Sequence, residues 1–368
     1  MNRLIFVISG VLLISGCENA AIPAESGVSL CTLSIIDSVG VELGDSAYIF
    51  GAILGAEFMP FGGFAVLDRA AGNIRLYSDT GSHQRTISRG GSGPGEIVQA
   101  YGLIVWPNGD MGVFDPYQGG LMRFNPGGEY LGLQFEAVQN IPLDPVMVGD
   151  SSYVAMRSAI HHENDQVFVE SFLGSFPMTW EPSVKYISDL TLFDPSGLGD
   201  FLISTFFYRP WTVDRRRGTV YVAPYDQGRY SIMVFNPDGS SGGVLTLPTV
   251  PVEKTPDEIA GEREYIAAFL TAAEGGDPMY NVWCDPLPFK HPVGSMTVDD
   301  AGNLWVLRGD RDDVFFNVWN ASGEHAFDCV LPGVPGGDIR FRVSGNRMLL
   351  YRENPLDYQK IYIIAVPW

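Results

Sequence analysis

The sequence predicts an all-β fold, namely a six-bladed β-propeller with a short helical insertion. Three observations support this prediction: the composition, a repeated pattern of Asp, aromatic and Gly residues, and the spacing of the repeats. The chain has 368 residues, of which 46% are hydrophobic and 18% are charged, so it can bury a large core and is not disordered. Its 43 Gly and 25 Pro are scattered along the chain, which indicates many short elements separated by turns.

The chain begins with an export signal over residues 1–17. A short basic start precedes an apolar run over 4–13, which is too short to span a bilayer as a helix. The run leads into the motif ISGC, which resembles the lipidation signal of bacterial lipoproteins and implies cleavage before Cys17 and acylation of Cys17. An ordinary secretory signal with a chance Cys is the competing interpretation, and both interpretations predict export.

Residues 18–27 have the composition of a tether between the anchor and a folded domain. In lipoproteins of this kind, an Asp after the lipidated Cys retains the protein at the inner membrane, whereas this chain has Glu18 at that position. The resemblance therefore implies attachment to the outer membrane through the lipid on Cys17, with the domain facing the periplasm or the cell surface. We expect residues 28–368 to form one propeller domain.

The central observation is a repeat without gaps in four segments. Each segment has an Asp, an aromatic residue nine positions later and a Gly four positions beyond the aromatic. We expect the Asp to bond backbone N–H groups of its turn, the Gly to adopt a positive φ, and the aromatic to fill the layer between neighbouring sheets. The repeats are Asp68, Tyr77 and Gly81; Asp115, Phe124 and Gly128; Asp226, Phe235 and Gly239; and Asp310, Trp319 and Gly323.

The spacing of the repeats sets the number of blades. Two weaker copies fill the gaps near residues 155 and 350, which gives six units of about 45 residues, the length of a four-stranded propeller blade. The chain ends inside the sixth unit. We therefore expect a strand from the N-terminal segment, within Ser29 to Ile36, to complete the last blade and close the ring.

The helical insertion is predicted over about 255–275, between the fourth and fifth units. Thr255 and Glu258 form a capping pattern with Pro256 at the first helical position, and Gly275 and Gly276 end the helix. The insertion can serve as a cap on exposed sheet or as a lid over the axial cavity, and the sequence leaves both roles open.

The stretch ISRGGSGPGEIVQAYGLIVWPNGDMGVFD, residues 87–115, resembles the linker and following blade of six-bladed propellers of the NHL-repeat and TolB-like kind. With the repeat, the resemblance covers most of residues 60–368. It is specific for the fold rather than the function, because this group includes binding scaffolds, lactonases and lyases. It also implies that a functional site lies at the axis of the ring, where the first strand of each blade and the linker entering it point.

Four residues at blade entrances are the candidates for ligand binding. They are Tyr101, Arg209, Trp211 and His291. The aromatic residues can stack on a sugar or a peptide, or they can fill the layers between blades. Arg209 can bind an anionic ligand or pair with a neighbouring carboxylate. His291 precedes the first strand of its blade and is the best-placed histidine for an axial site.

A metal cofactor is expected only if the protein is an enzyme. In propellers related by fold, axial histidines hold zinc in lyases, and carboxylates and Asn hold calcium in lactonases. This sequence departs from the zinc pattern, because His161 and His162 lie in a polar stretch that indicates a surface loop. The acidic turn that begins at Asp310 is interpreted as a solvated loop rather than a calcium site. No hydrolase or metalloprotease motif is present, so no catalytic residue is assigned and no cofactor is expected.

Three cysteines, Cys31, Cys284 and Cys329, follow the signal. An oxidising compartment allows one disulfide with three pairings, among which we favour Cys284 with Cys329; free buried thiols are the alternative.

The charge balance limits the partners. With 43 acidic and 23 basic side chains the formal charge is −20, which disfavours binding to nucleic acid. We expect a non-catalytic binding or scaffold module for a protein, peptide or glycan. The alternative is a lactonase- or lyase-like enzyme with an axial divalent metal, calcium or zinc. The sequence determines neither the ligand nor the oligomeric state.

Overall fold

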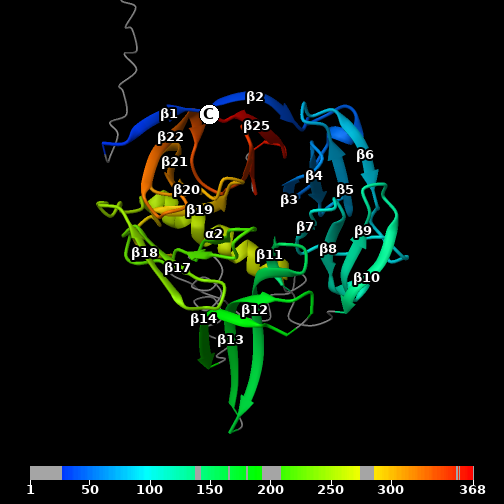
Figure 1. The fold of residues 1–368 in the computed structure, drawn as a ribbon, viewed down its shortest axis with the longest axis horizontal. Coiled ribbons are helices and arrows are strands. Elements are labelled where there is room, and N and C mark those ends of the chain that lie inside the picture. Colours follow the sequence, from blue (N-terminus) through cyan, green and yellow to red (C-terminus); the bar gives the residue numbers. More distant parts are fainter. Residues whose placement is uncertain are drawn as a thin grey trace, which may run out of the picture.

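A computed structural model describes residues 27–136, 142–164, 166–179, 181–192, 209–273, 286–353, 355 and 357–367. Six β-sheets surround a central axis and form a ring of six blades (Figure 1). The predicted six-bladed propeller is confirmed. The candidate lipidation site Cys17, residues 18–26 of the tether and Cys284 lie outside the described residues.

The first four blades are four-stranded antiparallel sheets whose strands follow one another in chain order. Blade one contains β3 (Ile53–Phe58), β4 (Phe64–Asp68), β5 (Asn73–Tyr77) and β6 (His83–Ile87). Blade two contains β7 (Leu103–Val105), β8 (Met111–Asp115), β9 (Gly120–Phe124) and β10 (Tyr130–Glu136). Blade three contains β11 (Leu143–Val148), β12 (Ser152–Glu163), β13 (Gln166–Phe176) and β14 (Val184–Leu192). Blade four contains β15 (Trp211–Val213), β16 (Val220–Val222), β17 (Ser231–Phe235) and β18 (Ser241–Thr246).

The last two blades each include a strand from the N-terminal segment. Blade five contains β19 (Val293–Val298), β20 (Leu304–Arg308), β21 (Asp313–Trp319), β22 (His325–Pro335) and β1 (Ser29–Thr32). Blade six contains β23 (Ile339–Ser344), β24 (Arg347–Arg352), β25 (Ile361–Ala365) and β2 (Ser34–Val39). Two single-turn 3-10 helices, η1 (Ser46–Tyr48) and η2 (Pro116–Gln118), lie in connections.

The closing strand differs in part from the prediction. β2 pairs antiparallel with β25 and completes blade six, but β1 pairs parallel with β22 and adds a fifth strand to blade five. The predicted segment 29–36 therefore serves two blades instead of one. The N-terminal segment runs along the outer rim of both blades (Figure 1).

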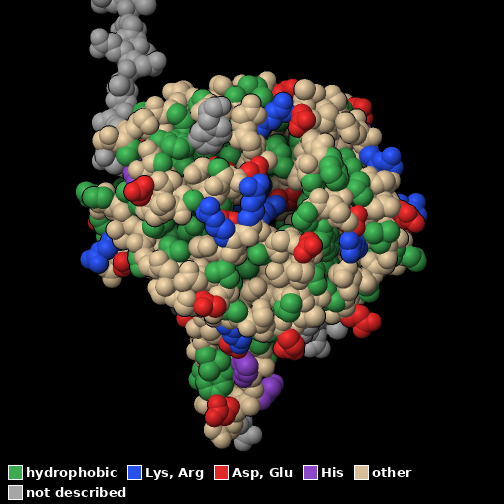
Figure 2. Space-filling model, viewed as in Figure 1, with side chains coloured by type: hydrophobic (Ala, Val, Ile, Leu, Met, Phe, Trp, Pro, Cys, Tyr) green, Lys and Arg blue, Asp and Glu red, His purple; other side chains and the backbone are tan. Residues whose placement is uncertain are grey.

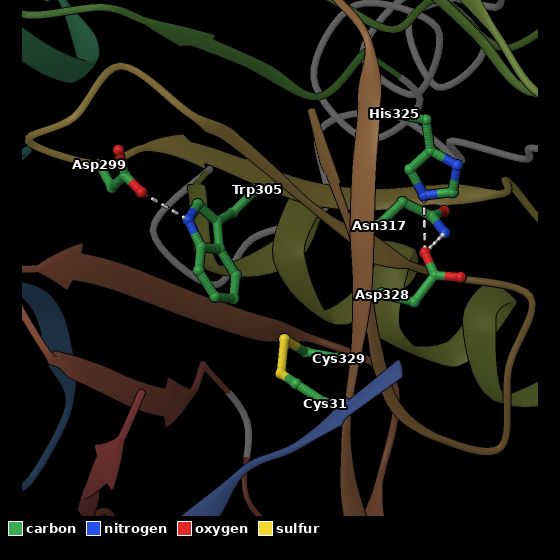
Figure 3. Close-up of a disulfide and its surroundings, with 7 residues drawn as sticks. All are labelled: Cys31, Asp299, Trp305, Asn317, His325, Asp328 and Cys329. Carbon is green, nitrogen blue, oxygen red and sulfur yellow. Dashed lines mark hydrogen bonds and ion pairs between the residues drawn. A yellow bond between two sulfur atoms is a disulfide. The ribbon is translucent and has the colours of Figure 1, made fainter. Parts of the chain in front are cut away.

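The disulfide joins Cys31 to Cys329, so the favoured pairing of Cys284 with Cys329 is wrong (Figure 3). The parallel register of β1 and β22 places the two cysteines directly opposite each other, with a Cα–Cα distance of 4.5 Å. The prediction failed because it placed Cys31 on the strand that closes blade six. The bond instead fixes the N-terminal segment to blade five.

The repeat residues have the expected roles at ten of twelve positions. All four aromatics are buried, and all four glycines have positive φ between 76° and 88°. Asp68 accepts hydrogen bonds from three backbone N–H groups and Asp115 from four. Asp226 is exposed, and Asp310 instead pairs with the Arg308 guanidinium at 2.6–2.8 Å.

The predicted helical insertion is α2 (Pro256–Ala273). Its capping box is present, because the Glu258 N–H donates to Thr255 Oγ1 at 3.2 Å and the Thr255 N–H donates to Glu258 Oε2 at 2.8 Å. Two ion pairs, Lys254 to Glu262 at 2.5 Å and Lys290 to Glu258 at 2.7 Å, fasten the helix to the chain segments on either side of it. In Figure 1, α2 passes behind the centre of the ring. Among the described residues, no helix is long and apolar enough to cross a membrane.

The ring has two faces, which we name by the connections that lie there. On the turn face, the first strand of each blade turns into the second. On the connection face, the last strand of one blade leads to the first strand of the next. The first strands β3, β7, β11, β15, β19 and β23 contact one another in this cyclic order and surround the axis. Blade one is therefore opposite blade four, and blade three is opposite blade six.

Candidate binding site at the propeller axis

The four predicted ligand-binding residues do not converge on one free site. His291 is engaged inside the fold: its Nε2 lies 3.0 Å from the Ala223 carbonyl oxygen, and its Nδ1 lies 3.1 Å from the Val293 N–H. Burial lowers the pKa of His291 to about 4, although the bond to Ala223 opposes this shift. The ring is therefore neutral near pH 7, with Nε2 protonated, and it links blade four to blade five.

Arg209 and Trp211 have the structural roles that the sequence left open. The Arg209 guanidinium pairs with the Asp189 carboxylate of β14. Trp211 packs on the apolar layer between blades three and four. These two neighbours therefore join adjacent blades rather than form an open anion site.

Tyr101 packs in the layer between blades two and three. Its hydroxyl accepts a hydrogen bond from Gln99 Nε2 at 2.9 Å, and burial raises its pKa. The residue supports the linker that enters blade two.

The axis itself contains an ionic cluster that the sequence prediction missed. Glu57, near the end of β3, has a side chain that is only 4% exposed. Its Oε2 lies 2.5 Å from Arg215 Nη2, and its Oε1 lies 2.7 Å from Arg342 Nε. Arg215 belongs to the turn after β15 in blade four, so its contact with Glu57 of blade one crosses the axis.

The two arginines determine the charge state of Glu57. Burial by itself would raise the pKa of this carboxyl, but the charges and hydrogen bonds of Arg215 and Arg342 hold the pKa below its ordinary value. Glu57 is therefore ionised near neutral pH. We call Glu57, Arg215 and Arg342 the axial triad.

A second ionic group lies nearer the connection face. Arg340 precedes Arg342 by two residues on β23, which places it about 7 Å along the strand. Its Nε lies 2.7 Å from Glu353 Oε1, and its Nη2 lies 3.4 Å from Asp144 Oδ2 on the opposite blade three. Ion pairs therefore link opposite blades at two heights along the axis: Glu57 to Arg215, and Arg340 to Asp144.

The signal for this cluster is present in the sequence. Along β23, Ile339, Phe341 and Val343 are buried, whereas Arg340 and Arg342 alternate with them and are partly exposed. Strand residues two apart share a face, so charged residues at alternate positions of a first strand indicate side chains that face the axis. The prediction considered the residues before each first strand and overlooked those within it.

The axial residues do not fit a divalent metal. Both oxygens of Glu57 already contact a guanidinium, and a cation bound there would lie beside two positive charges. Asp310, in the acidic turn, is likewise held by Arg308. Within the described parts of the chain, no three His, Cys, Asp or Glu side chains gather in a way that could hold a metal ion.

The predicted loop around His161 and His162 is instead the end of strand β12. The strands β12, β13 and β14 extend beyond the ring, where the purple histidines of Figure 2 mark the projection (Figures 1 and 2). The prediction failed because the polar residues lie on an exposed sheet, where solvent solvates both faces.

The base of this projecting sheet is held by Glu170. Its carboxylate contacts His161 Nε2 at 2.9 Å, Lys185 Nζ at 2.5 Å and Ser188 Oγ at 2.6 Å. Burial opposes ionisation of Glu170, but these three hydrogen bonds lower its pKa to about 2. His161 therefore contacts Glu170 within the sheet and stabilises the sheet rather than binding a metal.

Comparison with known proteins gives matches by structure alone. No protein-family description matches the chain, and no curated protein matches it in sequence. A gluconolactonase from Xanthomonas campestris has 11% identity and a TM-score of 0.44, with 91% of this chain and 97% of that chain covered. Regucalcin from Agrobacterium tumefaciens, a calcium-binding protein, has 10% identity and a TM-score of 0.45, with 92% and 97% covered.

Virginiamycin B lyase from Staphylococcus aureus has 10% identity and a TM-score of 0.42, with 91% of this chain and all of that chain (100%) covered. At these identities the likeness concerns the fold alone. The chain is a six-bladed β-propeller, and gluconolactonase and regucalcin propellers are among its structural neighbours.

Proposed function

We propose that this protein is an exported, lipid-anchored β-propeller that binds a protein or peptide partner without catalysis. The observation that carries this proposal is the projecting sheet of blade three. It exposes three aliphatic side chains beyond the ring, Ile160 at 57%, Leu190 at 60% and Leu192 at 46%. Leu190 and Leu192, two residues apart on β14, share one face, and neighbouring exposed apolar side chains of this kind are typical of protein interaction sites.

The chemistry of this sheet favours a protein or peptide over a glycan. Sugars bind mainly to aromatic faces and to polar groups, whereas the exposed side chains here are aliphatic. Ile160 and Leu190 lie on opposite faces of the sheet, because Ile160 pairs with Val169 and Leu190 pairs with the next residue, Glu170. A partner that embraces the projection would cover both.

A site-specific photo-crosslinker tests this surface. Placed at Ile160, it should give one discrete crosslinked product in cells that produce the full-length protein. Leu43, which is 84% exposed on the N-terminal segment, provides a matched control position that should give none. Equal crosslinking patterns at the two positions, or no product at Ile160, would rule out this surface as the binding site.

The membrane anchor is a separate part of the proposal. The ISGC motif supports acylation of Cys17 and an outer-membrane location. Cys17→Ser should release the protein from the membrane fraction. If the variant still sediments with membranes, another anchor holds the protein.

The enzyme alternative, a lactonase- or lyase-like propeller with an axial metal, has no support from the axial triad. Elemental analysis of the purified protein, dialysed without chelator, tests it directly. We expect substoichiometric calcium and zinc. One tightly bound divalent ion per chain would restore the enzyme alternative.

A further inference from the structure

We propose that the turn-face mouth of the axial channel binds a small oxyanion, a carboxylate or phosphate group, between Arg215 and Arg342. This inference goes beyond the proposed partner surface, which lies on blade three. It rests on the donors of the axial triad, on their exposure and on the residues around them.

Each guanidinium group of the triad has N–H groups that its described contacts leave unused. Within the described parts of the chain, Arg215 uses only Nη2, on Glu57, and Arg342 uses Nε on Glu57 and Nη1 on the Phe341 carbonyl at 3.0 Å. A guanidinium has more N–H groups than these contacts use. Among the described residues, Arg215 Nε and Nη1 and Arg342 Nη2 have no other partner.

These donors are reachable from solvent. The Arg215 side chain is 37% exposed and the Arg342 side chain 28%, whereas Glu57 between them is 4% exposed. In Figure 2, basic side chains gather around a hollow at the centre of the ring, with acidic side chains deeper inside it. The guanidinium groups of Arg215 and Arg342 are therefore accessible from the channel, whereas the Glu57 carboxylate is buried.

The surrounding charges favour an anion. Arg216 and Arg217 follow Arg215 in the same turn and are exposed, so this turn carries three arginines after one buried aspartate, Asp214. The neighbouring Asp214 is occupied in its own turn by the N–H groups of Arg216 and Arg217, at 2.8 and 3.0 Å. In a chain of net charge −20, such a local excess of arginine attracts oxyanions to this mouth.

Glu57 acts as an internal competitor in this arrangement. Its carboxylate occupies one side of each guanidinium and limits how strongly an added anion can bind. The proposal therefore makes predictions of opposite sign: loss of an arginine weakens oxyanion binding, and loss of the Glu57 charge strengthens it. A purely structural ion cluster would bind no oxyanion in either case.

Calorimetric titration of the purified protein with citrate, succinate and inorganic phosphate tests the proposal, with sodium chloride at matched ionic strength as the reference. We expect saturable binding by the wild type, at least about tenfold weaker binding by Arg215→Gln, and several-fold tighter binding by Glu57→Gln. Arg342→Lys keeps the charge but loses the planar fork, and it should bind more weakly than the wild type. Arg89→Gln, at an exposed pair with Glu96, is the matched control and should bind as the wild type does.

The outcomes separate the sources of the oxyanion. Binding of citrate or succinate but not phosphate identifies a carboxylate ligand, and the reverse identifies a phosphate. The proposal is overturned if neither the wild type nor Glu57→Gln shows saturable binding, or if Arg215→Gln binds as well as Arg89→Gln. Crosslinking at Ile160 is independent of these results, so either proposal can fail alone.

Discussion

Glu57 is the residue on which the ionic structure of the axis depends. It is buried, it lies between Arg215 and Arg342, and it joins blade one to blades four and six. Removing a buried charge from such a cluster leaves its partners without compensation, which costs more than the pair itself contributes. The partial exposure of both arginines reduces this cost, because water can solvate them.

Glu57→Gln should therefore destabilise the fold by about 2–3 kcal/mol at pH 7, as measured by urea denaturation. The pKa of Glu57 is lower in the folded chain than in the unfolded chain. Its contribution to the free energy of unfolding is therefore complete above the ordinary carboxyl pKa, and it is lost as the pH falls through the pKa of the folded state. The wild type and the variant should thus converge in acid. Glu163→Gln, exposed at the end of β12, should leave the midpoint unchanged, and an equal loss in both variants would contradict the prediction.

The lowered pKa of His291 predicts a second pH dependence of the free energy of unfolding. Its pKa is about 4 in the folded chain against 6.5 ordinarily, so the unfolded chain binds the proton more readily between these values. The free energy of unfolding should fall by up to about 3 kcal/mol from pH 7 to pH 4 because of this group. His291→Gln should flatten this slope in urea denaturation at several pH values, whereas His162→Gln, exposed on the projecting sheet, should keep it. Parallel slopes for wild type and His291→Gln would refute this role.

At the scale of elements, the N-terminal segment is the most consequential. β1 and β2 are consecutive strands, yet they belong to different blades and pair in opposite senses. The bond between Cys31 and Cys329 spans 298 residues of sequence. A crosslink over so long a loop restricts the unfolded chain strongly.

Cys31→Ser should lower the free energy of unfolding by about 2–4 kcal/mol. Adding a reductant should bring the wild type to the stability of the variant and leave the variant unchanged, as measured by urea denaturation. If reductant has no effect on the wild type, the disulfide is not formed or does not stabilise the fold.

For the whole molecule, closure of the ring is the main constraint. Without β2, blade six has three strands and the edge of β25 is exposed, and an unpaired edge promotes pairing with other chains. Without β1, blade five still has four strands of its own. Loss of β2 therefore exposes the edge of β25 in a three-stranded blade, whereas loss of β1 leaves a complete four-stranded blade.

A chain that starts at residue 33 should remain a monomeric propeller, whereas one that starts at residue 40 should self-associate and lose near-ultraviolet circular dichroism. Size-exclusion chromatography with light scattering measures whether each chain is monomeric or self-associates. If both truncated chains are monomeric with the same urea midpoint, β2 is not needed for closure.

The sequence by itself determined the features that depend on local pattern. The turn aspartates Asp68 and Asp115, the buried aromatics and the capped helix after Thr255 each follow from residues within a few positions of one another, as does the spacing that predicts six blades. The alternation of Arg340 and Arg342 with apolar residues along β23 also indicated that these two arginines face the axis, although the prediction did not use it.

Only the tertiary structure decided which distant segments meet. The register of β1 on β22 selects Cys31 as the partner of Cys329, and ring closure brings Glu57 to Arg215 across the axis. These contacts depend on how six blades close around one axis, which no local pattern specifies. The candidate residues Tyr101, Arg209, Trp211 and His291 were correctly placed near blade entrances, but packing between blades gave each of them a partner inside the fold.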